Sequence, residues 1–556
     1  MNLLTKILEP RTNAPEITWT FTNLLAVKLS ASTIEKDLEV HPDYPSLLSI
    51  SDVLNNYDIE NIGIKLEPDK FKEIPTPFIT QLKGKNSNND FFTVVTSLNN
   101  DQVNFLDPEK YKWVTLPYPD FLKRCSGIIL LAEAGENAGE KEYFKKVKIE
   151  KRKKISQTAI SIAIPLIVLF ASITCFNQHT TSALLSVIFS FLTLAGCIAG
   201  VLLIWYEVDQ HNPLLKQICS GGKKINCGAV LQSKAAKIAG ISWSTIGLSY
   251  FAGMLLLLLF GGLTNPRILF LTAWINVAAI PYVIFSIYYQ WRIAKQWCIL
   301  CLAVQAMLVL QFTIAFLGDW HALIHIENIT SELIIQTFTA FTIPFLTITI
   351  LLPALKKAKE SKHVNIELQK LKHNPQIFEA LLHKQKQVTL STKGMGITLG
   401  NNNAAYKLIK VCNPYCGPCA DAHAPIEDLL HNNPNVQVQV LFTATNDDND
   451  ARTPPVKHLL AIAGTNQESI TKQALDDWYM AKKKDYEAFA AKYPMNGELK
   501  QQDAKIEAMK QWCHNVKIEF TPTFFVALPA ADGEEDKLYQ LPNMYTVADL
   551  KYFFTV

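Results

Sequence analysis

The sequence predicts a multi-domain membrane protein. One α/β soluble domain precedes an all-α membrane domain of six spans in the sequence, and a second α/β soluble domain follows it. Long apolar runs crowd the middle of the 556-residue chain, and segments of mixed charged and apolar character flank them. A chain of this length has room for about three or four domains. We expect three, over residues 1–135, 155–355 and 365–556.

Net charge and cysteine content limit the classes of function that the chain can have. A net charge of +3 gives no support to a nucleic-acid partner. Eleven cysteines in so long a chain do not make a small disulfide scaffold, and their CxxC spacing indicates metal binding or redox exchange. The start of the chain, Met1-Asn-Leu-Leu-Thr-Lys6, shows no visible secretory signal.

The first 135 residues are predicted to be soluble. Charged and apolar residues are mixed there, and strand-like runs occur at 91–98 and 103–106. A strongly basic stretch from Lys145 to Lys154 then precedes the first apolar run.

Six apolar runs predict six transmembrane helices. Each is close to the ~20 residues that cross ~30 Å of hydrocarbon at 1.5 Å per residue. Buried core helices are the alternative, but such helices seldom extend so far without a charge. Prolines 165, 281 and 344 are tolerable in spans, because neighbouring helices satisfy the freed carbonyls. The runs cover residues 155–176, 182–206, 241–263, 268–290, 297–318 and 333–355.

Six crossings put both termini and every cysteine pair on one side of the membrane. That side also carries nearly all the basic residues near the spans, whereas the opposite loops carry only Arg267. By the positive-inside rule the basic side is cytoplasmic.

The first cysteine pair, Cys298-Ile-Leu-Cys301, opens the fifth apolar run. Residues i and i+3 share a helix face, and a helix N-terminus stabilises a thiolate. The pair also lies at the membrane boundary, within reach of a lipid-soluble oxidant. A structural zinc site shared with Cys219 and Cys227, or two unreactive buried cysteines, are the alternatives to redox exchange.

The second pair, Cys219 and Cys227, flanks the linker Ser-Gly-Gly-Lys-Lys-Ile-Asn. This polar linker suits a shuttle arm. Taken alone, the pair fits a static structural disulfide equally well.

Together these residues resemble the vitamin K epoxide reductase family over about 182–318. That family has a four-helix bundle with two loop cysteines and a CxxC at the head of the fourth helix. Cys219 and Cys227 match the loop pair, and Cys298 and Cys301 match the quinone-side pair. Ser233 stands where the family has a serine or threonine, and the resemblance gives it and Cys301 a place at the quinone. The sixth span resembles the helix that tethers a thioredoxin-like domain in bacterial fusions.

The third pair, Cys416-Gly-Pro-Cys419, lies in the soluble C-terminal segment. A buried strand from 406 to 411 is predicted before it and a helix after it, so that the first sulfur sits at a helix N-terminus. The segment resembles thioredoxin-like proteins. Thr521-Pro522 matches their cis-proline loop, which docks substrate backbone, and 453–515 matches a helical insertion.

The remaining cysteines are predicted to carry less chemistry. Cys412 and Cys513 are either ordinary buried cysteines or a second structural pair. His423 is predicted to be a surface helix residue rather than a proton donor. The cysteines predicted to be inert are Cys125, Cys175 and Cys197.

Residues 1–135 resemble peptidase C39 domains, through His41-Pro-Asp-Tyr-Pro45, the strand near Phe91 and Leu106-Asp107-Pro108. A working site of that family needs an early cysteine and a histidine. Here the first cysteine is Cys125, and Asp90 or Phe91 holds the histidine position. Only Asp107 of the triad remains, so we expect either a module that binds a peptide such as a leader sequence, or a structural appendage.

These resemblances imply a quinone-dependent thiol–disulfide oxidoreductase. Reduced cysteine-containing proteins or peptides give electrons to Cys416–Cys419, with Cys416 attacking and Cys419 resolving. Exchange with Cys219, then between Cys227 and Cys298, brings the electrons to Cys301 and to menaquinone or ubiquinone. No metal is expected. The implied location is a bacterial cytoplasmic (inner) membrane.

Two other functions stay open. One is a peptide-docking or export-accessory membrane protein. The other is a membrane reductase that runs the relay in reverse, because CGPC is the motif of strongly reducing thioredoxins. The compartment is also open, since disulfide formation favours the periplasm or exterior and the basic flanks favour the cytoplasm.

Overall fold

The computed structural model forms two compact units, Lys145–Asn365 and a second made of Thr12–Phe144 with Ile366–Val556. The structure describes residues 12–84, 90–99, 101–109, 111–179, 183–210, 212, 215, 218–219, 225–323, 330–447, 449–495, 497–528 and 537–554, without the side chains of residues 68, 69 and 234.

The described residues of the membrane unit form six helices long and apolar enough to span a bilayer, which confirms the six predicted spans. Several extend beyond the predicted runs, because basic residues continue the helix outside the apolar stretch. Prolines 165, 281, 344 and 353 lie inside these helices. The helices are α6 (Tyr143–His179), α7 (Leu184–Val208), α10 (Trp243–Gly261), α11 (Pro266–Tyr288) continued by the π-turn η4 (Tyr289–Ala294), α12 (Ile299–Leu317) and α13 (Ser331–Lys372).

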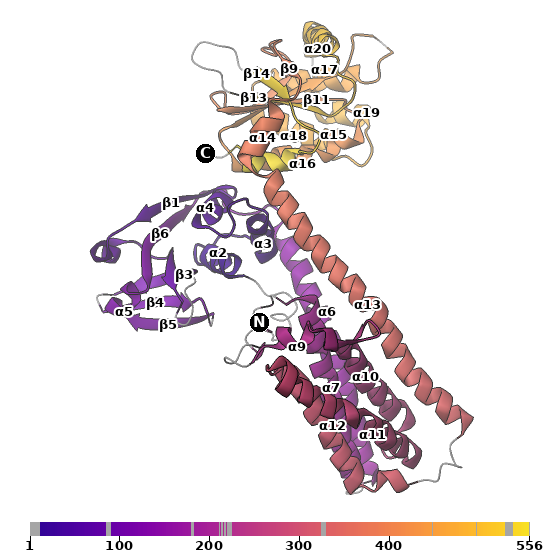
Figure 1. The fold of residues 1–556 in the computed structure, drawn as a ribbon. Helices are drawn as coiled ribbons and strands as arrows, with labels where there is room; N and C mark the ends of the chain where they lie inside the picture. Colours follow the sequence, from indigo (N-terminus) through magenta and orange to yellow (C-terminus); the bar gives the residue numbers. More distant parts are fainter. Residues whose placement is uncertain are drawn as a thin grey trace. The chain divides into compact units, whose positions relative to one another are not determined.

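Helices α7, α10, α11 and α12 lie side by side as a bundle (Figure 1). Small residues allow the closest approach: a Cβ on Gly196 of α7 would collide with the ring of Phe251 on α10. Short elements cover one end of the bundle. They are α9 (Cys227–Leu231), η3 (Lys234–Ala236), β7 (Lys237–Ile238) and β8 (Ile241–Ser242), while η5 (Trp320–Ala322) follows α12.

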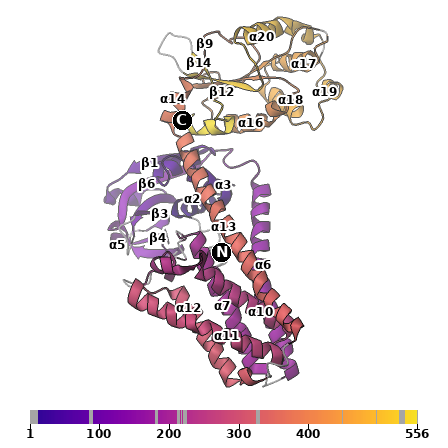
Figure 2. The same cartoon turned by 45° about the vertical axis from the view of Figure 1, so that its right-hand side comes forward.

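The N-terminal part of the second unit is an antiparallel six-stranded sheet in the order β1-β6-β2-β3-β4-β5. Helices α2, α3 and α4 pack with the sheet through one buried apolar cluster (Figure 2). The predicted strands 91–98 and 103–106 are confirmed as β3 and β4. The elements are α2 (Asn13–Leu24), α3 (Ala31–Glu39), α4 (Leu47–Asn55), β1 (Ile59–Lys65), η1 (Pro68–Glu73), β2 (Phe78–Lys83), β3 (Asp90–Leu98), β4 (Gln102–Asp107), β5 (Lys112–Pro117), α5 (Tyr118–Leu122) and β6 (Cys125–Ala134).

The C-terminal part is a mixed six-stranded sheet in the order β10-β12-β11-β13-β14-β9, in which β11 and β12 are parallel. The predicted strand at 406–411 is confirmed as β11, and the helical insertion as α17 to α20. The elements are α14 (Pro375–Leu382), β9 (Gln387–Val388), β10 (Ile397–Gly400), β11 (Tyr406–Cys412), α15 (Gly417–Asp421), α16 (His423–Asn432), β12 (Val436–Phe442), α17 (Thr453–Ala463), α18 (Glu468–Tyr479), α19 (Tyr486–Lys492), η7 (Glu498–Gln502), α20 (Asp503–Asn515), β13 (Thr523–Leu528), β14 (Lys537–Gln540) and η8 (Val547–Tyr552).

Candidate functional site

Cys219 and Cys227 form a disulfide with their Cα atoms 5.4 Å apart. Both side chains are buried. Cys227 begins α9, and the Asn226 side chain caps this short helix by accepting a hydrogen bond from the backbone N–H of Ala229 at 3.1 Å. The central part of the predicted shuttle linker, residues 220–224, lies outside the described residues.

Cys298 and Cys301 open α12, as the sequence predicts. Cys298 is the N-cap residue, and its Sγ accepts a hydrogen bond from the backbone N–H of Cys301 at 3.3 Å. The two Sγ atoms lie 2.6 Å apart. Before the pair, the chain leaves the π-turn η4 through Lys295 in a left-handed conformation. This irregular backbone ends one helix and starts the next within a few residues, which places both sulfurs at the bundle end.

A backbone bridge brings these two pairs together. Ile225 and Trp297 form a parallel β-bridge, and the N–H of Asn226 donates to the carbonyl of Trp297 at 3.1 Å. A cysteine comes just after the bridge residue on each segment: Cys227 follows Ile225, and Cys298 follows Trp297. All four cysteines of the two pairs belong to one buried apolar cluster. With Cys219 and Cys227 disulfide-bonded, four free thiolates for the alternative zinc site are not present.

Two buried glutamines beside the pair escaped the sequence analysis. Gln290, in the π-turn, accepts a hydrogen bond from the backbone N–H of Cys298 at 2.8 Å. Ser286 Oγ accepts hydrogen bonds from Gln290 at 3.3 Å and from Gln305 at 2.5 Å. Gln305 lies one turn after Cys301, and its Oε1 has no hydrogen-bond partner among the described residues. A buried amide side chain in an apolar span costs free energy. The presence of glutamines in these spans was therefore the sequence signal that could have identified them as functional residues.

The third pair lies at the turn between β11 and α15. Cys416 caps α15, and its Sγ lies 3.3 Å from the carbonyl oxygen of Thr521, which precedes the cis-proline Pro522. The predicted facing of the CGPC motif and the proline loop is therefore present. A pocket of about 520 Å³ adjoins them, and its lining includes Pro418, Phe520, Pro522, Leu541 and Tyr545. Polar side chains, among them Asp421 and Asn543, line the same pocket.

The two sulfurs of this pair have different environments. Cys416 is half-buried, whereas Cys419 is fully buried. Burial raises the pKa of Cys419 to about 12, and electrostatic repulsion from the neighbouring Cys412 adds to the rise. Burial thus shields the Cys419 sulfur, and Cys416 is the more exposed of the two.

Cys412 and Cys513 are free thiols, so they do not form the second structural pair that was one of the two alternatives predicted from the sequence. The prediction for His423 was wrong. His423 is buried and its Nε2 lies 2.7 Å from Asp476 Oδ1, because helix α18 of the insertion covers that face of α16. His423, Glu427 and Asp476 bring ligand atoms within 4.8 Å of one another.

Three family models match the chain in the order of its domains. The peptidase C39 family matches residues 21–137, the vitamin K epoxide reductase family residues 187–316, and thioredoxin residues 392–534. The membrane core is a vitamin K epoxide reductase domain. A C39-like domain precedes it and a thioredoxin-like domain follows it, which confirms the predicted fold class. Together the matches support a membrane thiol–disulfide oxidoreductase.

Solved structures resemble the two soluble domains. A double-glycine-motif protease from an AMS/PCAT transporter, in complex with the leader peptide, is 21% identical over 22% of this chain and 85% of its own (TM-score 0.20). A cysteine-to-alanine variant of α-DsbA1 from Wolbachia pipientis is 15% identical over 28% and 86% (0.23). Oxidised BdbD from Bacillus subtilis is 11% identical over 27% and 90% (0.22). Comparison with curated proteins finds no match to this chain.

Within the vitamin K epoxide reductase domain, Ser233 makes a local contact. Its hydroxyl donates to the carbonyl of Val230 at 2.8 Å, and the residue caps the short helix η3. This contact orders the segment that follows α9.

The C39-like domain has no catalytic constellation at the expected place. Asn13, at the start of α2, exchanges two hydrogen bonds with the backbone of Phe92 on β3, at 3.0 and 2.7 Å. Asp107 is buried at the end of β4 and accepts from the N–H of Glu109 at 2.9 Å. Cys125 lies on β6, where its Sγ contacts Thr80 Oγ1 at 3.3 Å and burial raises its pKa. Acyl transfer therefore lacks its thiol and its imidazole.

Alkylation of the reduced full-length protein should separate the two CGPC sulfurs. Below its pKa a thiol gains thiolate about tenfold per pH unit, so the labelling rate of Cys419 should rise without levelling from about pH 7 to about pH 10. Residue-resolved mass spectrometry measures this rate. Labelling of Cys419 that levels off near neutral pH would contradict the buried, protonated state.

Proposed function

We propose that the chain couples protein disulfide formation to quinone reduction through its three cysteine pairs. The observation that carries this proposal is the bridge between Ile225 and Trp297, because it holds the cysteines that follow, Cys227 and Cys298, in one buried cluster. A buried apolar surrounding also protects the exchanging sulfurs from competing soluble thiols.

The relay is a series of thiol–disulfide exchanges, each of which moves two electrons. A substrate dithiol reduces the Cys416–Cys419 disulfide and becomes a disulfide itself. The Cys416 thiolate then attacks Cys219, Cys227 leaves, and Cys419 displaces Cys219 to restore its own disulfide. Cys227 next attacks Cys298 of a Cys298–Cys301 disulfide and Cys301 leaves. Cys219 then attacks Cys227, which displaces Cys298 and closes the loop disulfide again. Cys298 and Cys301 are left as the reduced pair at the bundle end.

Menaquinone or ubiquinone would accept this electron pair together with two protons. The residues that would hold it lie beside Cys301. The orphan Oε1 of Gln305 can accept a hydrogen bond from a hydroxyl group, and Gln290 and Ser286 fix the local geometry. In our proposal Ser233 orders the nearby segment, since its hydroxyl already has a backbone partner.

Quinone reduction by the purified full-length protein tests this function. Given a dithiol without oxygen, the protein should reduce a soluble quinone, and Cys301→Ala should lower the rate to background because the last sulfur is lost. Absorbance of the quinone measures the rate. Cys175→Ala, a free cysteine of α6 outside the relay, is the matched control. Full activity of Cys301→Ala would exclude the relay as drawn.

We propose further that the cysteine pairs and both termini face the periplasm or exterior of a bacterial cytoplasmic membrane. The chemistry supports this side, because disulfides persist in oxidising compartments. A protease added to intact spheroplasts should therefore degrade the thioredoxin-like domain. Digestion only after lysis would place the domain in the cytoplasm and support the positive-inside assignment.

The C39-like domain is proposed to bind a peptide, such as the leader of a cysteine-containing substrate, without cleaving it. The loss of the thiol and the imidazole supports binding without proteolysis. Titration of the full-length protein with a double-glycine leader peptide, followed by mass spectrometry, should detect saturable binding and an intact peptide. A cleaved peptide would contradict this role, and absent binding would leave the domain a structural one.

A further inference from the structure

Lys410 is a buried lysine in the core of the thioredoxin-like domain. It lies on β11, which pairs with β12 on one side and β13 on the other, and its residue is only 1% exposed. Lysine is almost never fully buried without a partner. A charge at this depth is costly, so its surroundings must favour it specifically.

Two contacts hold the Lys410 ammonium. It donates a hydrogen bond to the carbonyl oxygen of Cys419 at 3.0 Å, and it lies 4.5 Å from the centre of the Tyr479 ring. Both partners attract a cation, one through the carbonyl dipole and one through the face of the ring. Among the described residues Lys410 forms no ion pair with a carboxylate. Its positive charge is therefore not neutralised at contact distance.

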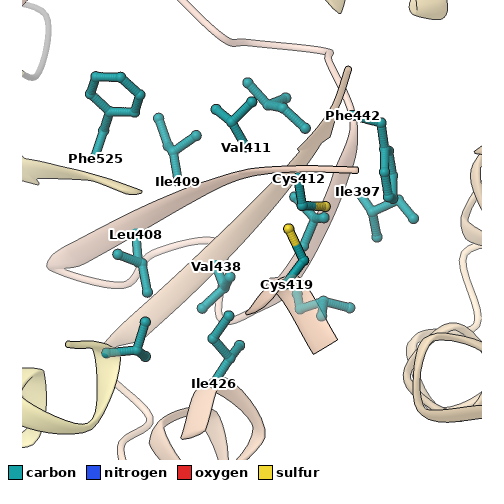
Figure 3. Packing of buried hydrophobic residues seen from close by; sticks show 14 of the residues in the cluster. Ile397, Leu408, Ile409, Val411, Cys412, Cys419, Ile426, Val438, Phe442 and Phe525 are labelled. Atoms are coloured by element: carbon teal, nitrogen blue, oxygen red, sulfur yellow. The ribbon is translucent and has the colours of Figure 1, made fainter. Parts of the chain in front are cut away.

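The groups around this ammonium lie beside the CGPC pair. Lys410 and Cys412 share one face of β11, because successive side chains of a strand alternate. Figure 3 shows Cys412 and Cys419 close to each other in the core, and Cys412 is one of the groups that raise the pKa of Cys419. The hydroxyl of Tyr479 lies 3.0 Å from the Cys412 sulfur. His423 on α16, which contacts Asp476 on α18, packs against Tyr479 with their ring centroids 5.3 Å apart.

The charge of Lys410 is felt by these neighbours. Burial first, and then Lys410, lowers the pKa of His423, against the opposing effect of Asp476. Burial raises the pKa of the Cys412 thiol, and Lys410 opposes that rise. A positive charge in this core thus favours negative charge on the sulfurs near it.

We propose that Lys410 is a positioning residue for the CGPC pair: it fixes the backbone of Cys419, and its positive charge favours the uptake of electrons by the Cys416–Cys419 disulfide, which makes that disulfide an oxidant. This inference rests on the proposed function and gives it a direction. The CGPC sequence by itself would favour a reducing domain. The buried ammonium shifts the balance toward accepting electrons from substrate thiols.

The chemistry of that step balances within the domain and its substrate. A substrate thiolate attacks Cys416, the Cys416–Cys419 bond breaks, and the electron pair stays on the Cys419 sulfur. A second substrate thiolate displaces Cys416 and completes the substrate disulfide. The substrate loses two electrons and two protons, and Cys416 and Cys419 gain them. Lys410 stabilises the negative charge that the buried Cys419 sulfur carries as the disulfide breaks, before that sulfur takes up its proton.

The reduction potential of the pair tests the proposal. The full-length protein is equilibrated with glutathione buffers without quinone, and the oxidation of the peptides containing Cys416 and Cys419 is measured by mass spectrometry. Lys410→Met should lower the equilibrium constant for oxidising glutathione about tenfold, which corresponds to ~30 mV. The fold should persist, because an apolar residue of similar size replaces a buried charge.

The control is Lys407→Met on the same strand, which should leave the potential unchanged. Lys410→Gln repeats the measurement with a neutral residue that keeps a donor for the Cys419 carbonyl, and it should also lower the constant. An unchanged or raised potential in folded variants would overturn the proposal. Failure of both Lys410 variants to fold would assign the residue a purely structural role and overturn it as well. Quinone is absent, so the result is independent of whether the membrane relay operates.

Discussion

The bridge between Ile225 and Trp297 is the contact on which the membrane site depends. Residues 225 and 297 are far apart in the sequence, yet one backbone pairing sets the segments of Cys227 and Cys298 next to each other. The π-turn before Trp297 supports this pairing, because Gln290 of that turn binds the backbone of Cys298. An exchange reaction needs sulfurs at close range, and this pairing brings together the two segments that carry Cys227 and Cys298.

The two redox centres use different means to control their sulfurs. In the membrane domain the four cysteines lie among apolar side chains, and amide side chains are the polar groups beside Cys298 and Cys301. In the thioredoxin-like domain a buried ammonium lies behind the pair, and a pocket of about 520 Å³ opens beside it. The first arrangement favours protected transfer, and the second favours contact with a protein substrate.

The sequence predicted those features that repeat or that have fixed spacing. Six apolar runs predicted six spans, and the spacing of Cys298 and Cys301 placed both at the start of a helix. Single residues were harder. Lys410, Gln290 and Gln305 act through contacts between different elements of the fold, and no helix or strand periodicity reveals those contacts. His423 was misjudged for the same reason, since the cover that buries it comes from α18.

Capture of the exchange intermediates tests the central claim most directly. In one full-length variant Cys419 and Cys227 are replaced by serine, and in another Cys219 and Cys301, so that the partners left behind cannot resolve a mixed disulfide. After mild oxidation, mass spectrometry under non-reducing conditions should find Cys416 joined to Cys219 in the first and Cys227 joined to Cys298 in the second. Absence of both links, while the unmodified protein still turns over dithiol and quinone, would contradict the relay.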